Sequence, residues 1–366
     1  MQLDFLSMAE KIGYLDSLRG VAALTVVLCH FGFAFYQALL GDLTSKYNSG
    51  FESLLYNTPV SILFNGRFAI FIFFVLSGYV LTYKFFSTGD QAILKSSAIR
   101  RYFRLLPPVL LSLLCTLVII LLFLSFISAV SDLTGIAYLK SYFCLPPDLF
   151  SILRQAFWGS FFDPNVTYNS VLWTMGVEFI GSMLVFTMAG LFGKTPNRWV
   201  FYLGAGLFLL NTYYLSFLLG MLLADMYNGE SRKRFGIPGS VILLLVLGAG
   251  LFLGSWYNVI PGEVLQVLIP GISLNTTILF PCIGAFLVLL ALLNSDQLKK
   301  ILSNKYLIFL GNISFSMYLM HEIVFGTFTT LLVLVLVNIF HLPYLSALKT
   351  GILRKIVCPH LCPIKT

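Results

Sequence analysis

The sequence predicts an all-α, polytopic membrane protein with about ten transmembrane helices and both termini in the cytoplasm. Of its 366 residues, 58% are hydrophobic and only 10% are charged, whereas an average soluble domain carries about 25% charged residues. The mean hydropathy is +0.90. The apolar residues form runs close to the roughly 20 residues that a helix needs to cross a bilayer. This composition leaves almost no room for a separate soluble domain.

The apolar runs give the expected helices in order. We expect spans at about 15–38, 60–83, 105–130, 170–192, 198–210, 213–227, 237–256, 268–293, 306–321 and 323–341. The two short runs on either side of Asn211 should form a hairpin, and the last two runs are separated at His321 and Glu322. Pro107 and Pro108 should set the start of the third span, because proline is favoured in the first turn of a helix.

Two connections, 39–59 and 131–168, are long enough to hold structure of their own. The second carries Pro146, Pro147 and Pro164 among aromatic residues. Proline has no amide hydrogen and breaks helices. We therefore expect 131–168 to form an ordered, folded-back loop rather than a helix.

Basic residues decide the predicted orientation, because cytoplasmic loops carry the excess of Lys and Arg. With the N-terminus inside, 19 of the 23 Lys and Arg residues fall on the cytoplasmic side, and the other four, Lys46, Arg67, Lys140 and Arg154, fall outside. The predicted organisation is a cytoplasmic N-terminal segment (1–13), a transmembrane domain (14–341) and a basic cytoplasmic tail (342–366).

The distribution of charge and the spacing of the cysteines argue against two kinds of ligand, nucleic acid and a metal ion. The net charge of +8 follows the orientation, so we expect no nucleic-acid partner. The tail sequence from Cys358 through His360 to Cys362 has metal-ligand residue types, but no second pair of ligands accompanies it. We interpret it as an unstructured tail and expect no metal site.

Arg19 and His30 lie eleven residues apart in the first predicted span, on one face and roughly 16 Å apart along a helix axis. An ionisable residue inside a membrane span is costly and by default marks a functional site. A cation at the inner end would bind an anionic donor, and an imidazole further along would accept a proton from an alcohol. The alternative is an arginine that reaches the interface and a histidine bonded to a neighbouring helix.

Arg101 and Arg104 lie three residues apart, so they are neighbours on a helical turn. Their forked guanidinium groups suit phosphates, and simple anchoring at the cytoplasmic surface is the alternative. In the second span, Ser77 and Gly78 form a small pair that allows close helix approach, and we expect a packing role for them.

Glu178 lies about two turns into the fourth span, at a predicted depth similar to that of His30. A buried carboxylate needs a partner, and we expect Glu178 to orient or charge-balance His30. A structural pair with an arginine or a tyrosine is the alternative. His321, with Trp173 and Tyr318, is our candidate for substrate binding, and for His321 the alternative role is to cap a helix end.

These motifs together resemble the acyltransferase-3 family of integral membrane O-acyltransferases, which modify sugars on glycans and related acceptors. The resemblance covers roughly 14–340 and rests on LDSLRGVAAL with His30, FFVLSGYVL, RRYFRLLP, WTMGVEF and ISFSMYLMH, in this order. It implies that Arg19 and His30 act in catalysis and that Arg101 and Arg104 bind the donor. One departure is Ala69, where many members carry Asp, which puts in doubt an acceptor role for an acid at this point.

The sequence therefore predicts an O-acyltransferase that moves an acyl group, most simply acetyl, from cytoplasmic acyl-CoA to a hydroxyl of an extracytoplasmic glycan or glycoconjugate. We expect His30, Glu178 and Arg19 to be catalytic, and no permanently bound cofactor beside the acyl-CoA donor. The other expected partner is membrane lipid, and the plasma membrane is the expected location. The alternative is a transporter or flippase that moves a polar substrate without covalent chemistry.

Overall fold

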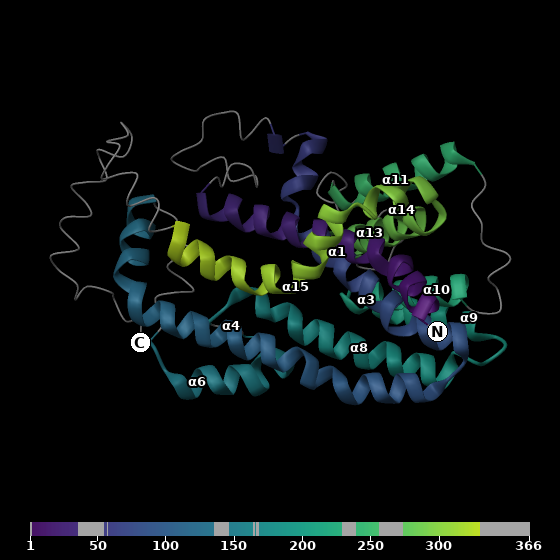
Figure 1. Ribbon diagram of the computed structural model, residues 1–366, viewed down its shortest axis with the longest axis horizontal. Helices are drawn as coiled ribbons and strands as arrows, with labels where there is room; N and C mark the ends of the chain where they lie inside the picture. Colours follow the sequence, from purple (N-terminus) through teal and green to yellow (C-terminus); the bar gives the residue numbers. More distant parts are fainter. Residues whose placement is uncertain are drawn as a thin grey trace. The chain divides into compact units, whose positions relative to one another are not determined.

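The computed structural model describes residues 2–35, 55–56, 58–134, 146–163, 165, 168–228, 239–255 and 274–329, and every regular element within them is helical. Figure 1 shows these helices with their labels. In chain order they are α1 (Gln2–Phe35), the 3₁₀ helix η2 (Pro59–Phe64), α3 (Gly66–Thr88), α4 (Gln91–Thr134), α6 (Leu149–Arg154), the π-helical turn η3 (Gln155–Gly159), α7 (Ser160–Phe162), the 3₁₀ turn η4 (Ser170–Leu172), α8 (Trp173–Phe192), α9 (Arg198–Leu209), α10 (Tyr214–Asn228), α11 (Ser240–Ser255), α13 (Thr276–Asn294), α14 (Asp296–Leu302), α15 (Lys305–Val324) and the π-helical turn η5 (Phe325–Thr329).

Within the described residues, six helices are long and apolar enough to cross a membrane. These candidate spans are Gly13–Phe33, Gly66–Thr88, Gln91–Leu122, Ser170–Phe192, Thr276–Asn294 and Lys305–Phe328, and Arg198–Leu209 and Ser240–Ser255 are shorter apolar helices. The all-α class is confirmed, and this set of apolar helices fits an integral membrane protein. The count of ten spans and the cytoplasmic location of both termini stay predictions.

Three expected boundaries are wrong. Pro107 and Pro108 lie inside α4 instead of starting it; in a membrane protein, neighbouring groups can satisfy the backbone that an internal proline frees. Helix α15 runs through His321 and Glu322 to Val324, because both polar side chains have partners inside the protein. The segment 131–168, expected to be a loop, includes the end of α4, and its part 146–163 contains α6, η3 and α7, which begin after Asp148 caps the backbone amides of Phe150 and Ser151. Residues 135–145 of this segment lie outside the described residues.

The chain divides into two compact units. Unit 1 comprises residues 1–26, 59–104 and 177–315, and unit 2 comprises residues 27–58, 105–176 and 316–366. Helices α1, α4, α8 and α15 each contribute residues to both units.

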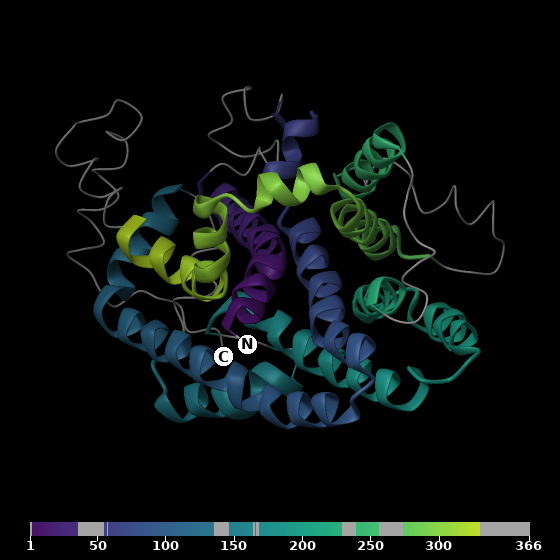
Figure 2. The same ribbon diagram turned by 45° about the vertical axis from the view of Figure 1, so that its right-hand side comes forward.

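Unit 1 is built around α3 and α10, which lie side by side in Figures 1 and 2. A Cβ atom at Gly78 would meet the carbonyl oxygen of Phe217 at 2.1 Å, and one at Gly220 would meet that of Val75 at 2.0 Å. The close approach expected at Gly78 is therefore confirmed, and Gly220 supplies the opposing small residue. Helices α11 and α13 pack in the same way, since a Cβ at Gly284 would meet the carbonyl oxygen of Gly250 at 2.6 Å.

Two polar contacts tie the ends of unit 1 helices together. The Asn65 side chain caps α3 by accepting from the amide of Phe68 and donates to the carbonyl oxygen of Gly254 at 3.0 Å. Arg198 at the start of α9 donates two hydrogen bonds, of 2.6 and 2.9 Å, to the carboxylate of Asp225 near the end of α10. The second contact closes the short α9–α10 hairpin that was expected around Asn211.

Unit 2 is held together by hydrogen bonds between the start of α8 and the final turns of α15. Asn169 is buried and donates to the carbonyl oxygen of Leu319 at 3.0 Å. Thr174 shares a 2.9 Å hydrogen bond with the hydroxyl of Tyr318. These contacts position the segment of α15 that carries His321 and Glu322.

Candidate functional site

His30, His321 and Glu322 form a cluster of ionisable side chains among the described residues of unit 2. His30 comes from α1, and the other two are adjacent residues of α15. His30 Nδ1 lies 2.9 Å from His321 Nε2, and the two rings are tilted by 42° with their centroids 4.8 Å apart. His30 Nε2 lies 3.7 Å from the Oε1 atom of Glu322. Neighbouring residues of α15 therefore engage both nitrogens of one imidazole.

Glu322 is also held by Ser170 at the start of η4. The backbone amide of Ser170 donates to Glu322 Oε2 at 3.0 Å, and the Ser170 hydroxyl donates to Oε1. A buried carboxylate needs hydrogen-bond donors to offset its desolvation. Ser170 supplies two of them, which fixes the carboxylate where it can also reach His30.

Exposure separates the roles that these three side chains can play. The side chain of His30 is 18% exposed and that of Glu322 is 3% exposed, and residue His321 is 4% exposed. Of these three side chains, that of His30 is therefore the most open to a reacting molecule. Tyr318, 5% exposed, is also buried and directs its hydroxyl to Thr174. Trp173 is half-buried at the start of α8.

The same three residues are also a possible donor set for a metal ion, since each has a ligand atom within 4.8 Å of the others. A shared zinc ion would lie about 2.0–2.1 Å from each nitrogen, with both lone pairs aimed at it. Instead, His30 Nδ1 and His321 Nε2 face each other at the distance of an N–H···N hydrogen bond. We therefore interpret the cluster as a hydrogen-bonded network.

Glu178 lies in unit 1, where its carboxylate pairs with Arg101. The Arg101 Nη2 atom donates to Glu178 Oε1, and the hydroxyl of Ser77 donates to the same oxygen at 2.6 Å. Arg101 Nε donates to the hydroxyl of Ser182 at 2.9 Å. Both charged side chains are largely buried, at 13% and 12% exposure. This network joins α3, α4 and α8, and it matches the alternative interpretation of Glu178 as the partner of an arginine.

Two further arginines, Arg104 and Arg19, lie near this ion pair and form with Arg101 the arginine group. The charges of Arg104 and Arg19 lie near enough to act on Arg101. Arg104 is exposed, and Arg19 is partly exposed and donates to Asp16 at 3.0 Å. Asp16 and Glu178 offset two of the three arginine charges, so one positive charge remains in excess. Binding of an anionic donor by these residues stays a prediction.

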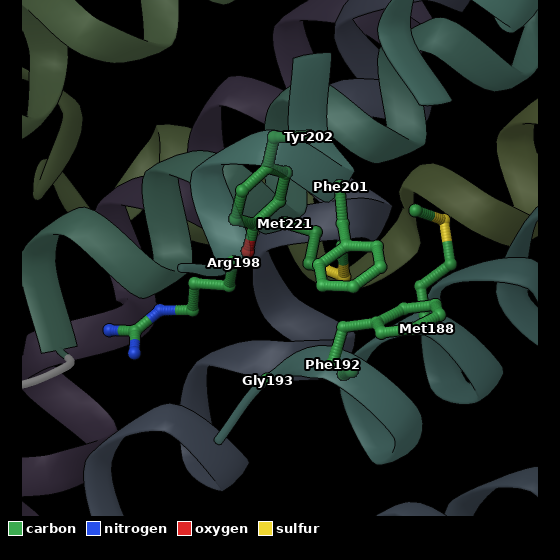
Figure 3. A pocket seen from close by; sticks show the side chains of 8 residues that line it. Met188, Phe192, Gly193, Arg198, Phe201, Tyr202 and Met221 are labelled. Carbon is green, nitrogen blue, oxygen red and sulfur yellow. The ribbon is translucent and has the colours of Figure 1, made fainter. Parts of the chain in front are cut away.

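A small pocket between α8, α9 and α10 lies near the Arg198–Asp225 pair. Figure 3 shows the rings and thioethers that line it, while the Arg198 side chain extends away from them. Its volume is about 10 Å³, which is room for about one water molecule. The pocket is too small for a substrate and contains none of the predicted site residues.

The structure thus separates the predicted residues into two groups. Arg19, Arg101, Arg104 and Glu178 belong to unit 1, and His30, His321, Trp173 and Tyr318 belong to unit 2. Among the described residues of unit 2, the carboxylate of Glu322 lies beside His30, and a pairing of Glu178 with His30 stays a prediction. Helix α15 continues past His321, so this residue does not cap a helix end.

Sequence reasoning missed Glu322 and its partner Ser170. A signal for Glu322 was present, because a carboxylate beside a histidine within an apolar run is costly and by default functional. Ser170 carried no such signal, since an isolated serine near the start of a helix is common. Its role depends on a contact across 152 residues of sequence.

Comparison with known proteins adds the family. The sequence model of the acyltransferase-3 family, described as an acyltransferase domain, matches residues 12–352. The chain is similar to the O-acetyltransferase PaAT-1 of Phomopsis amygdali, with 26% identity over 376 aligned positions that cover 86% of this chain and 72% of the relative. No solved structure matches the chain.

Proposed function

Because this chain belongs to the acyltransferase-3 family and is an acyltransferase, we propose that it transfers an acetyl group from cytoplasmic acyl-CoA to a hydroxyl of an extracytoplasmic glycan or glycoconjugate. The name of the Phomopsis amygdali relative, an O-acetyltransferase, supports both the acetyl group and the hydroxyl acceptor. The 19-to-4 distribution of basic residues supports an orientation in which the arginine group faces the cytoplasm.

The observation that carries the proposal is the environment of His30. Its imidazole is accessible, is hydrogen-bonded to a second histidine and lies 3.7 Å from a buried carboxylate. A general base needs a lone pair within reach of the acceptor proton and a group that stabilises its charged form. His30 with Glu322 meets both requirements.

The arginine group supports an anionic donor. Acyl-CoA carries several phosphate charges, and planar guanidinium groups bind phosphate oxygens with two hydrogen bonds at once. Arg104 is the exposed member of the group and is the residue that we assign to the phosphates. Arg101, which Glu178 and Ser182 already engage, holds the site in place and contributes charge.

In the proposed reaction, His30 takes the proton of the acceptor hydroxyl as its oxygen bonds to the carbonyl carbon of the thioester. The carbon–sulfur bond then breaks, and the sulfur leaves as the thiolate of CoA. The proton held by His30 passes to that thiolate. The products are the acetyl ester and CoA, and the imidazole is neutral again.

The test uses purified full-length protein in liposomes supplied with acetyl-CoA, together with mass spectrometry of surface glycans from cells with and without the gene. We expect release of CoA and an acetyl ester that disappears when the gene is removed. His30→Ala should lower turnover by about 10²–10⁴-fold, the usual contribution of a general base. Leu24→Ala, at an exposed apolar position of the same helix, is the matched control and should keep full activity.

Two results would overturn the proposal. One is full acetyl transfer by His30→Ala at equal protein level. The other is counterflow of a polar substrate across the liposome membrane without thioester cleavage, which would identify a transporter.

A further inference from the structure

We propose that His321 and Glu322 are positioning residues that act through His30: His321 fixes which His30 nitrogen carries the hydrogen, and Glu322 stabilises the charged imidazolium. The proposal rests on the proposed function, because it describes how the base of that reaction is prepared. It assigns to His321 a role other than the substrate contact expected from the sequence.

Two backbone carbonyls determine which nitrogen of His321 carries the hydrogen. Its Nδ1 atom lies 2.7 Å from the backbone carbonyl oxygen of Tyr318 and 3.3 Å from that of Met317. Carbonyl oxygens only accept hydrogen bonds, so Nδ1 carries the hydrogen. In the neutral ring, Nε2 of His321 is then left with a lone pair.

The hydrogen position on His321 in turn determines the hydrogen position on His30. Its Nδ1 atom lies 2.9 Å from Nε2 of His321. Because that nitrogen of His321 is an acceptor, Nδ1 of His30 must be the donor. The lone pair of His30 is consequently on Nε2, the nitrogen nearer to Glu322. Two backbone carbonyls thus determine, through His321, which His30 nitrogen serves as the base.

A positive charge forms on the imidazole when His30 accepts a proton. The new N–H on Nε2 lies beside Glu322 Oε1, at 3.7 Å between the heavy atoms in the resting state. The carboxylate is held by Ser170 and is only 3% exposed. Opposite charges attract more strongly in a buried site than in water. Glu322 is therefore placed to stabilise the imidazolium and not to touch the substrate.

Burial rules out a direct catalytic role for the two positioning residues. His321 and Glu322 are 4% and 3% exposed, whereas the His30 side chain is 18% exposed. A base oriented by a third group recurs in enzymes that activate hydroxyl groups. Here the orienting group is a second histidine, with a carboxylate beside the basic nitrogen.

The test reads the hydrogen position directly. The chain contains four histidines, so ¹⁵N-histidine labelling of the full-length protein in lipid gives a simple NMR spectrum that distinguishes Nδ1–H from Nε2–H rings. We expect the Nδ1–H form for both His30 and His321, assigned by the signals that His30→Ala and His321→Ala remove. In His321→Ala, we expect His30 to lose its fixed Nδ1–H form.

The matched variant is His321→Gln, whose side-chain oxygen can still accept from Nδ1 of His30. It should keep the Nδ1–H form and most of the activity, whereas His321→Ala should lower kcat at least about 10-fold, within the general-base contribution, with KM for acetyl-CoA unchanged. Glu322→Gln should lower kcat similarly while His30 keeps its Nδ1–H form. A lower kcat with an unchanged KM for acetyl-CoA is not expected from a general loss of folding.

An Nε2–H ring at His30 in the wild-type protein would overturn the role of His321, as would equal kcat values for His321→Ala and the wild type. Wild-type kcat in Glu322→Gln would overturn the role of Glu322. Failure of the wild-type protein to cleave acetyl-CoA would instead overturn the proposed function. The NMR measurement would still decide the hydrogen position in that case, so the two failures are distinguishable.

Discussion

At the scale of single residues, two carboxylates, one largely buried and one fully buried, have different partners. Glu178 pairs with Arg101 and accepts from Ser77 in unit 1, and Glu322 accepts from Ser170 and lies beside His30 in unit 2. An arginine is always charged, so Glu178 balances a permanent charge. A histidine changes its charge near neutral pH, so Glu322 faces a group whose charge can appear and disappear during a reaction. The chemistry of the partner therefore favours Glu322 as the carboxylate of the reacting site.

Arg104 provides the sharpest residue-scale prediction about the donor. It is exposed and close to Arg101, so Arg104→Ala should weaken acetyl-CoA binding without unfolding the protein. A hydrogen bond to a charged group is worth about 1.5–3 kcal/mol, which corresponds to a roughly 10- to 100-fold rise in KM for acetyl-CoA. Arg104→Lys should recover only part of this loss, because the forked geometry is missing.

Lys300→Ala is the matched control for Arg104, because Lys300 is also an exposed cation on the predicted cytoplasmic side. Its KM should stay close to that of the wild type. An equal KM in Arg104→Ala and Lys300→Ala would leave Arg104 as a topological anchor alone.

At the scale of elements, unit 1 depends on glycines at helix crossings. Helices α3 and α10 approach so closely that Cβ atoms at Gly78 and Gly220 would overlap backbone atoms of the other helix. Helices α1 and α15 cross in the same way within unit 1, since a Cβ at Gly20 would meet the amide nitrogen of Gly311 at 2.5 Å. Small residues are favoured at helix interfaces in membranes because packing and backbone approach replace the hydrophobic effect there.

Gly220→Ala should therefore destabilise unit 1. The added methyl group would lie 2.0 Å from the carbonyl oxygen of Val75, and overpacking of this kind costs typically about 1–3 kcal/mol. A lower midpoint of thermal unfolding in detergent is the expected result.

Gly204→Ala on α9 is the matched control for Gly220, since a Cβ there meets nothing within 4 Å. Alanine is the better helix former by about 0.8–1 kcal/mol, so this variant should unfold at the same or a higher temperature. If Gly220→Ala were as stable as Gly204→Ala, the α3–α10 crossing would not be as tight as described.

At the scale of the whole molecule, the distribution of basic residues predicts the orientation in the membrane. The turn at Asp90 connects α3 to α4, and Pro147 precedes α6. Asp90 falls on the predicted cytoplasmic side, and Pro147 falls on the opposite side. Both are exposed, so a membrane-impermeant thiol reagent can test them.

In a background with the native cysteines replaced, Pro147→Cys should react with the reagent in intact cells, and Asp90→Cys should react only after the membrane is opened. The reverse pattern would show that the arginine group faces the outside and would contradict a cytoplasmic donor. Reaction of both positions in intact cells would contradict the predicted number of crossings between them.

The sequence by itself determined the helical class and the approximate positions of the helices and supplied the candidate site residues, because hydropathy and short motifs are local properties of the chain. Arg19, His30, Arg101, Arg104, Glu178 and His321 were all identified in this way. Only the tertiary structure decided which of them are partners: Arg101 for Glu178, and His321 with Glu322 for His30. The reason is physical, since the cost of burying a charge is local, whereas the group that offsets this cost can come from any helix packed against it. The same reason explains why α15 continues through His321 and Glu322, since their partners on α1 and η4 remove the need for a helix end there.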